Sequence, residues 1–334
     1  MPATAGCGGQ AAARGMPVSG GNGGGDLVFL HPHGKFDNHA RPYRHITALP
    51  LAAAMGAEIR GVDPAHITDA QFTEVEDALF RHKMIFFRGR DIGHAGHHAF
   101  SRRFGQFAED AYTEGVPGFR EVQPIIKEAD DRSAHVFGSG WHTDSPFLEA
   151  PPSITILRAV ETPPYGGDTL WADGALALRM LGGAMRAMLA PLRVRFSMRD
   201  VLVSAQANAE VRDSPIGRLA ATRTQPALPE GLRRKVEGSA HPLLRTHPRS
   251  GEQSLYLDSS YAIGIEGMAD AEARPLLAML CAHLTQPAFT CRLRWEPGTV
   301  ALWDNRLCVH QAFNDYDGFR REMYRTTVAG EQPG

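Results

Sequence analysis

The sequence predicts a mainly β fold with flanking helices (α+β), built on an antiparallel double-sheet core of the double-stranded β-helix or jelly-roll type. Three observations support this prediction. Many short apolar or alternating segments are bounded by turn residues, only a few segments have helical spacing, and no internal repeat is found. The 334 residues are 43% hydrophobic and 22% charged, which is typical of a globular protein with a substantial core.

The N-terminal elements have local signatures. Thr68 and Asp69 are typical of a helix start, and apolar residues follow at the helical positions 72, 75, 78 and 79. The apolar run 84–87 is bounded by charged residues and predicts a buried strand. Residues 94–104 predict a second helix. Its three histidines are not expected to bind a metal, because no carboxylate or cysteine joins them and helical histidines are usually solvated.

The centre of the chain alternates between strands, turns and helices. Residues 154–160 predict a strand, and the Pro- and Gly-rich stretch 163–168 predicts a turn. A helix is expected over 176–189, weakened by two glycines in its middle. The Pro-punctuated stretch 205–240 is interpreted as an insertion or lid.

The C-terminal part supplies further strands and one long helix. Residues 254–257 predict a strand, and 270–284 predict a helix with Pro275 near its first turns. Residues 289–295 and 299–303 both alternate in polarity and are expected to pair with each other.

Domain organisation follows from composition. Residues 1–26 are rich in Gly and Ala and predict a flexible tail. Residues 27–330 are interpreted as a single domain that carries the predicted lid around 205–240.

Charge and cysteine content exclude several classes of function. The net charge of −2 and the pI of about 6.7 give no basic excess for nucleic acid. No apolar stretch approaches the roughly 20 residues that span a bilayer, so no membrane partner is expected. The four cysteines show no Cys-x-x-Cys spacing, which favours reduced thiols and a cytoplasmic location. A small-molecule partner is expected, and homo-oligomerisation is left open.

The most informative pattern is a candidate metal site. His142 and Asp144 are two residues apart, so on a strand both side chains would point to the same face. His310, far downstream, could supply a third ligand if the fold brings it near. Two imidazoles and one carboxylate are the ligands of non-haem iron(II) oxygenases. An isolated His-x-Asp is more often a surface turn or a satisfied hydrogen bond, so this pattern alone leaves both interpretations open.

Several short motifs accompany these residues in a fixed order. They are Gly56-Ala57-Glu58-Ile59, Arg103-Phe104-Gly105, Trp141-His142-Thr143-Asp144, Gly166-Gly167-Asp168-Thr169, His241-Pro242-Leu243-Leu244-Arg245-Thr246-His247-Pro248, Trp303-Asp304-Asn305-Arg306, and His310 followed by Asp315-Tyr316, Arg321 and Arg325. With this order and spacing, residues 44–328 resemble the taurine dioxygenase-like (taurine/2,4-dichlorophenoxyacetate dioxygenase) family of Fe(II)/2-oxoglutarate-dependent oxygenases.

The resemblance implies roles for individual residues. His142, Asp144 and His310 would hold iron(II). Thr169 and Arg321 would bind the distal carboxylate of 2-oxoglutarate, which suits an arginine fork assisted by a hydroxyl. Arg325 would lie near the anionic group of the substrate or near the other end of the keto acid.

The resemblance also implies a reaction. With O2 as the oxidant, 2-oxoglutarate would be converted to succinate and CO2 while a C–H bond of a small organic acid is hydroxylated. Where the attacked carbon bears a sulfonate or an ether oxygen, the product would then collapse with cleavage of the C–S or C–O bond.

Departures from the family pattern concern the substrate. Asp110 stands where taurine dioxygenase has a histidine that holds the sulfonate, so taurine itself is not expected as the substrate. Tyr261 falls where the family keeps an aromatic residue that contacts the substrate. Residues 143–152 and 289–295 are similar to the aryloxypropionate branch.

Two alternative hypotheses are kept. A biosynthetic oxygenase of the same fold would act on an amino acid or another amine-bearing molecule, which Asp110 could pair with. A non-catalytic jelly-roll binding protein would have lost the chemistry, although retention of the three ligands and Arg321 argues against it. Hydrolase motifs of the Gly-x-Ser-x-Gly and His-Glu-x-x-His types do not occur.

Overall fold

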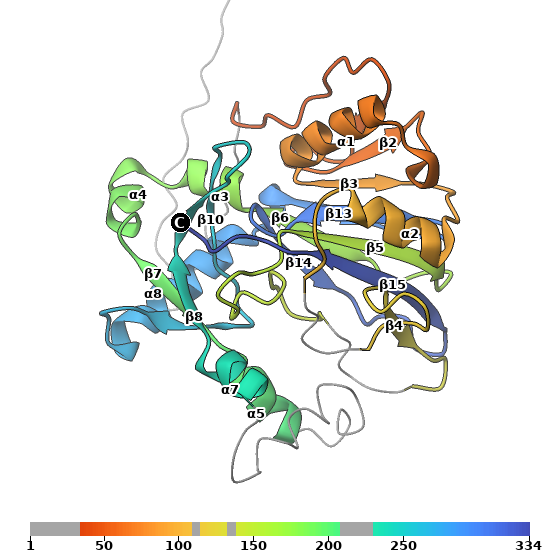
Figure 1. The fold of residues 1–334 in the computed structure, drawn as a ribbon. Helices are drawn as coiled ribbons and strands as arrows, with labels where there is room; N and C mark the ends of the chain where they lie inside the picture. Colours follow the sequence, from red (N-terminus) through yellow and green to blue (C-terminus); the bar gives the residue numbers. More distant parts are fainter. Residues whose placement is uncertain (1–33, 109–113, 132–137, 208–229) are drawn as a thin grey trace, which may run out of the picture.

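The computed structural model describes residues 34–108, 114–131, 138–207 and 230–334. The predicted tail 1–26, Asp110 and the central part 208–229 of the predicted lid lie outside the described residues. Within them the protein is mainly β with flanking helices, as predicted (Figure 1).

The largest sheet has seven strands in the order β1-β2-β3-β13-β5-β15-β4. Neighbouring strands are antiparallel except β2 and β3, which are parallel. Strand β5 from the middle of the chain therefore lies between two strands from its C-terminal part (Figure 1). The strands are β1 Thr47–Pro50, β2 Ala57–Arg60, β3 Met84–Phe87, β4 Gln123–Lys127, β5 Ile154–Glu161, β13 Val300–Asp304 and β15 Arg321–Val328.

Three smaller sheets complete the β structure of the described residues, in the orders β12-β6-β14, β11-β7-β8 and β10-β9. Strand β12 pairs with β6, whereas β13 pairs with β3 and β5, so the predicted pairing of 289–295 with 299–303 is wrong. The chain crosses between sheets at Gly298, whose φ of 75° suits glycine. The strands are β6 Thr169–Asp173, β7 Arg193–Phe196, β8 Ser239–Pro242, β9 Leu244–Thr246, β10 Gln253–Leu255, β11 Ala262–Ile265, β12 Thr290–Leu293 and β14 Cys308–Ala312.

The central strands of the seven-stranded sheet are buried on both faces. On β13, Val300 and Leu302 join one apolar cluster with side chains of α1 and α2, while the alternating Ala301 and Trp303 join another with the β12-β6-β14 sheet. Strand β5 alternates in the same way, so Leu157 faces the smaller sheet. The space between the two sheets is where the candidate site residues meet.

Helices α1 (Asp69–His82) and α2 (Gly93–Arg102) cover the outer face of the large sheet (Figure 1). The predicted helix 176–189 is in fact two, α3 (Gly174–Met180) and α4 (Gly183–Leu189), because the backbone is extended at Leu181 and Gly182. Helix α8 (Asp270–Leu284) has the predicted bounds.

Two further helices flank the central part of the predicted lid. Helices α5 (Arg199–Ala207) and α7 (Glu230–Glu237) lie side by side (Figure 1). Single 3-10 turns occur at Pro64–His66 and Pro287–Phe289. Among the described residues, no helix is both long enough and apolar enough to cross a membrane.

Thr68 caps α1 as its sequence predicts, and this gives a test of the local structure. Its hydroxyl accepts a hydrogen bond from the Gln71 backbone N–H, and the Gln71 side chain accepts one from the Thr68 N–H. We expect Thr68→Ala to lower the free energy of unfolding by about 1 kcal/mol. Denaturant unfolding would measure this, with Thr68→Ser as the control that keeps the hydroxyl; equal losses in both variants would contradict the capping role.

Candidate metal centre

The two candidate histidine ligands are brought together by backbone hydrogen bonds. His142 N–H donates to His310 O at 3.0 Å, and His310 N–H donates to His142 O at 2.8 Å. This isolated antiparallel bridge places the two imidazole rings with centroids 4.1 Å apart. The strand expected at 142–144 is thus reduced to one bridged residue, but that residue is enough to align the side chains.

Asp144 completes a compact group with the two histidines. Their candidate ligand atoms all lie within 4.8 Å of one another, and all three residues are buried. The Nε2 atoms of His142 and His310 are 3.8 and 3.9 Å from the same atom, Asp144 Oδ1. These separations are too long for hydrogen bonds, so the three groups face a common point without bonding to one another.

The contacts behind the ligands leave their inner atoms available. His142 Nδ1 lies 2.8 Å from Gly140 O and donates to it, which fixes the tautomer that has its lone pair on Nε2. Asp144 Oδ2 accepts a hydrogen bond from the hydroxyl of Thr155, which leaves Oδ1 on the inner side. Two imidazole nitrogens and one carboxylate oxygen on one face suit an iron(II) ion, so the residues present fit the predicted metal.

The protonation states agree with metal binding. Burial, together with the neighbouring His142, holds the pKa of His310 well below its usual value, so its ring is neutral and can act as a ligand. Burial works to raise the pKa of Asp144, but the neighbouring His310 and the guanidinium of Arg325 outweigh it and lower that pKa. Asp144 is therefore a carboxylate, the form that a metal needs.

A small cavity opens beside the three ligands. Gly138 forms part of its wall at a φ of 84°, and a Cβ there would lie 3.0 Å from Cε1 of His142. Any larger residue would crowd the histidine, so this glycine keeps the space beside the ligand open. The other described residues that line the cavity are Ile125, Leu157, Thr169, Trp303, Ala312, Arg321 and Arg325.

Arg321 is a buried cation in this cavity, 7% exposed. Its Nε has no hydrogen-bond partner, and it forms no ion pair with a carboxylate within the described ranges. Burial lowers its pKa, although Tyr316 and Asp168 oppose this effect. A buried guanidinium in this state is suited to an anion from outside the protein.

Thr169 faces the same cavity from β6. Its oxygen accepts a hydrogen bond from Trp295 Nε1 at 2.9 Å, so its own O–H remains able to donate to a ligand. The family resemblance assigns Thr169 and Arg321 to the same ligand. The structure places both residues in the lining of one cavity, together with the metal ligands.

Arg325 lies four residues after Arg321 on strand β15, and both side chains line the same cavity. Its Nη1 is 3.8 Å from Asp144 Oδ1, and Gln123 Oε1 is 3.4 Å from its Nε and 3.3 Å from its Nη2. The cavity therefore holds two buried guanidinium groups but a single carboxylate among its described lining residues.

The other two predicted substrate residues are not placed in this cavity. Tyr261 is buried and is not among the residues that line the cavity; its ring lies 6.5 Å from that of His142 and 5.2 Å from that of Phe147. Asp110 lies outside the described residues. Contact of either residue with a substrate stays a prediction.

Thr155 and Gln123 are functional candidates that sequence reasoning missed. Thr155 lies in an apolar strand, where a β-branched residue is typical of a core position. Gln123 lies in a short strand with no motif around it. The resemblance covered Asn305 but assigned it no role.

Comparison with known proteins places the chain in a family. The family model described as "Taurine catabolism dioxygenase TauD, TfdA family" matches residues 47–327, which is most of the chain. The chain belongs to the TauD/TfdA dioxygenase family. This confirms the predicted enzyme class, and the His-Asp-His group agrees with the predicted use of iron(II), 2-oxoglutarate and O2.

Individual TauD/TfdA relatives cover nearly the whole domain. The chain is 35% identical to an alpha-ketoglutarate-dependent sulfate ester dioxygenase of Pseudomonas putida, over 85% of this chain and 89% of the relative. It is 29% identical to an alkylsulfatase of Acinetobacter baylyi, over 87% of each. A crystal structure of a taurine dioxygenase from Burkholderia xenovorans matches with a TM-score of 0.70 and 35% identity, covering 87% of this chain and 93% of that one. The predicted jelly-roll core is thereby confirmed.

Proposed function

We propose that this member of the TauD/TfdA family hydroxylates the carbon next to the ester oxygen of a small sulfate ester. His142, Asp144 and His310 hold the iron, and Arg321 with Thr169 binds the distal carboxylate of 2-oxoglutarate. The observation that carries this assignment is the buried guanidinium of Arg321, which lacks an ion-pair partner in the described structure and lines the same cavity as the three ligands.

Iron(II), when bound, would activate O2, which is the oxidant that converts 2-oxoglutarate to succinate and CO2 and hydroxylates a C–H bond of the substrate. The protein positions the reactants and excludes water from the site. Arg321 and Thr169 orient the keto acid, and the apolar side chains of Ile125 and Leu157 limit the entry of water. Arg325 supplies a second positive charge for the anionic end of the substrate.

The substrate class rests on the relatives and on the charge of the cavity. The relatives named above as sulfate ester dioxygenase and alkylsulfatase act on esters that carry an anionic sulfate. The cavity combines Arg321 and Arg325 with apolar walls. This combination suits the simultaneous binding of 2-oxoglutarate and of an alkyl chain that ends in a sulfate.

The bond changes balance for such a substrate. One oxygen atom of O2 enters succinate and the other enters the hydroxyl on the attacked carbon. The hydroxylated ester then splits at its C–O bond, giving an aldehyde and sulfate, while the S–O bond stays intact. A hydrolase would give an alcohol instead of an aldehyde.

Product analysis tests the substrate. Iron-loaded protein with 2-oxoglutarate and O2 would be offered a primary alkyl sulfate, an alkyl sulfonate, an aryloxypropionate and an amino acid. We expect succinate, aldehyde and sulfate in equal amounts from the alkyl sulfate. Coupled turnover with only the aryloxypropionate or the amino acid would refute the sulfate ester proposal and favour the corresponding hypothesis above.

Arg325 should distinguish the two anion sites. We expect Arg325→Met to raise KM for the alkyl sulfate about 100-fold, because truncation removes a buried charge partner worth about 2–5 kcal/mol. KM for 2-oxoglutarate should change less than fivefold, as measured by succinate formation. Arg325→Lys keeps the charge beside Asp144 and serves as the control. A rise in KM for 2-oxoglutarate alone would place Arg325 at the keto acid instead.

A further inference from the structure

A line of hydrogen bonds runs from Asp144 into the protein. The Thr155 hydroxyl bonds to Asp144 Oδ2, and Asn305 Nδ2 donates to Thr155 Oγ1 at 2.9 Å. Trp303 Nε1 in turn donates to Asn305 Oδ1 at 3.0 Å. All four residues are buried, so water does not compete readily for these bonds.

The direction of each bond is fixed by chemistry. An indole N–H can only donate, so the amide oxygen of Asn305 must face Trp303 and its NH2 group must face Thr155. The Thr155 oxygen then accepts from Asn305, and a carboxylate can only accept, so the Thr155 proton points to Asp144 Oδ2. The line therefore has one consistent orientation, which occupies the outer oxygen of Asp144 and leaves the inner one free.

The backbone of Asn305 ties the same line to the segment between the two N-terminal ligands. Its carbonyl accepts the Thr143 hydroxyl at 2.8 Å, and its N–H donates to Ser153 O at 2.9 Å. Thr143 lies between His142 and Asp144, so one residue holds both the ligand segment and the carboxylate.

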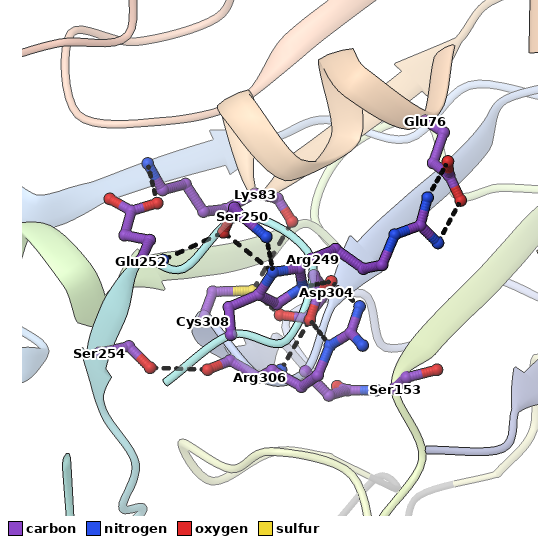
Figure 2. A network of polar contacts seen from close by, with 12 residues as sticks. Glu76, Lys83, Ser153, Arg249, Ser250, Glu252, Ser254, Asp304, Arg306 and Cys308 are labelled. Atoms are coloured by element: carbon purple, nitrogen blue, oxygen red, sulfur yellow. Dashed lines mark hydrogen bonds and ion pairs between the residues drawn. The ribbon is translucent and has the colours of Figure 1, made fainter. Parts of the chain in front are cut away.

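The turn that carries Asn305 is fixed from behind by a buried ionic network (Figure 2). Asp304 accepts hydrogen bonds from the backbone N–H and Nε of Arg306 at 2.9 and 2.8 Å, and it lies 3.0 Å from His247 Nε2. Arg306 also approaches Glu331 at 3.3 Å. These contacts hold the β13–β14 turn in one conformation.

From this geometry we propose that Thr155 and Asn305 are positioning residues that hold Asp144 so that one oxygen alone is presented to the metal. The inference rests on the proposed metal site. If the Thr155 hydroxyl is lost, Asp144 Oδ2 loses its donor and the carboxylate is free to rotate about its last bond. Metal affinity should then fall, as is usual when an outer partner of a ligand is removed.

The test is a titration of metal-free protein with Co(II) under anaerobic conditions, with no keto acid or substrate present. We expect Thr155→Val to weaken the Kd for Co(II) by about 10–100-fold and to change its visible d–d spectrum. Thr155→Ser, which keeps the hydroxyl, should restore both within about threefold. Asn305→Ala tests the line one step further away and keeps the Thr155 side chain.

A matched control separates positioning from general destabilisation. Thr326 is a fully buried threonine of the same sheet whose hydroxyl lies 2.6 Å from Ser101 Oγ and 3.1 Å from His97 Nε2, away from the metal ligands. Thr326→Val should lower thermal stability without changing the Kd for Co(II). A loss of affinity in Thr326→Val equal to that in Thr155→Val would overturn the positioning role.

The double variant Thr155→Val/Asn305→Ala sharpens the test. Because both residues act through one line, its loss of affinity should be close to that of Thr155→Val alone and not the sum of the two single losses. Unchanged affinity in Thr155→Val would overturn the inference and leave the metal site standing. Failure of the wild-type protein to bind Co(II) would instead refute the proposed site itself.

Discussion

Replacement of Asp144 by alanine is expected to abolish metal binding and substrate-coupled succinate formation. The change removes the only carboxylate among the three buried candidate ligands, and it leaves two imidazoles and Arg325 facing one another. Loss of an outer partner of a ligand commonly costs 10–100-fold, so loss of the ligand itself should cost at least about 1,000-fold in activity. His142→Ala should behave in the same way.

Metal content and turnover of the purified variant measure this effect. The control is Asp91→Ala, which removes an 85% exposed carboxylate that is paired with Arg158 on the same chain. Circular dichroism and thermal unfolding would show that Asp144→Ala is folded. Substantial turnover in folded, iron-supplemented Asp144→Ala would show that the metal site has been assigned wrongly.

Replacement of Arg321 by alanine is expected to raise KM for 2-oxoglutarate about 100-fold. Truncation of one partner in a buried charge pair costs about 2–5 kcal/mol, and each 1.4 kcal/mol corresponds to about a factor of ten. The loss should be specific to the keto acid, because Asp168, the nearby carboxylate that acts on the pKa of Arg321, is already paired with Arg292 and would not be left alone.

An anaerobic titration with iron(II) and 2-oxoglutarate would follow the weak visible charge-transfer band of the chelate. We expect the band in wild-type protein and its loss in Arg321→Ala at the same keto-acid concentration. Arg320→Ala is a matched control, since the neighbouring Arg320 is bound on the surface by Glu128, Glu161 and Glu322. Arg321→Lys should recover part of the affinity, because it keeps the charge but not the bidentate fork. Equal band intensity in wild type and Arg321→Ala would show that Arg321 does not bind 2-oxoglutarate.

The sequence correctly predicted those helices and strands that are determined by neighbouring residues in the chain. The helix start at Thr68, the buried strand Met84–Phe87 and the helix Asp270–Leu284 follow from capping and apolar spacing, and the structure contains all three. The pairing of strands does not follow from such signals. Residues 290–293 and 300–304 have similar patterns, but their partners are set by which sheet each segment enters.

The residues of the candidate site also fall into two groups, those that sequence motifs indicate and those that only the structure reveals. His142, Asp144, His310, Thr169 and Arg321 are carried by motifs, and the structure brings all five to one cavity. Thr155 has no motif, and its role depends on the hydrogen bond that its hydroxyl donates to Asp144, a residue outside its strand. A single sequence contains no signal for a contact of that kind.

The position of β5 has a consequence for how the chain matures in the cell. This apolar strand must wait for β13 and β15, which are synthesised much later, before either of its edges is paired. At about 5–20 residues per second, the nascent chain exposes those edges for on the order of ten seconds, a period in which chaperones would protect it from aggregation. His310 also arrives late, on β14, so iron can be loaded with its full ligand set only after translation has passed the last strands.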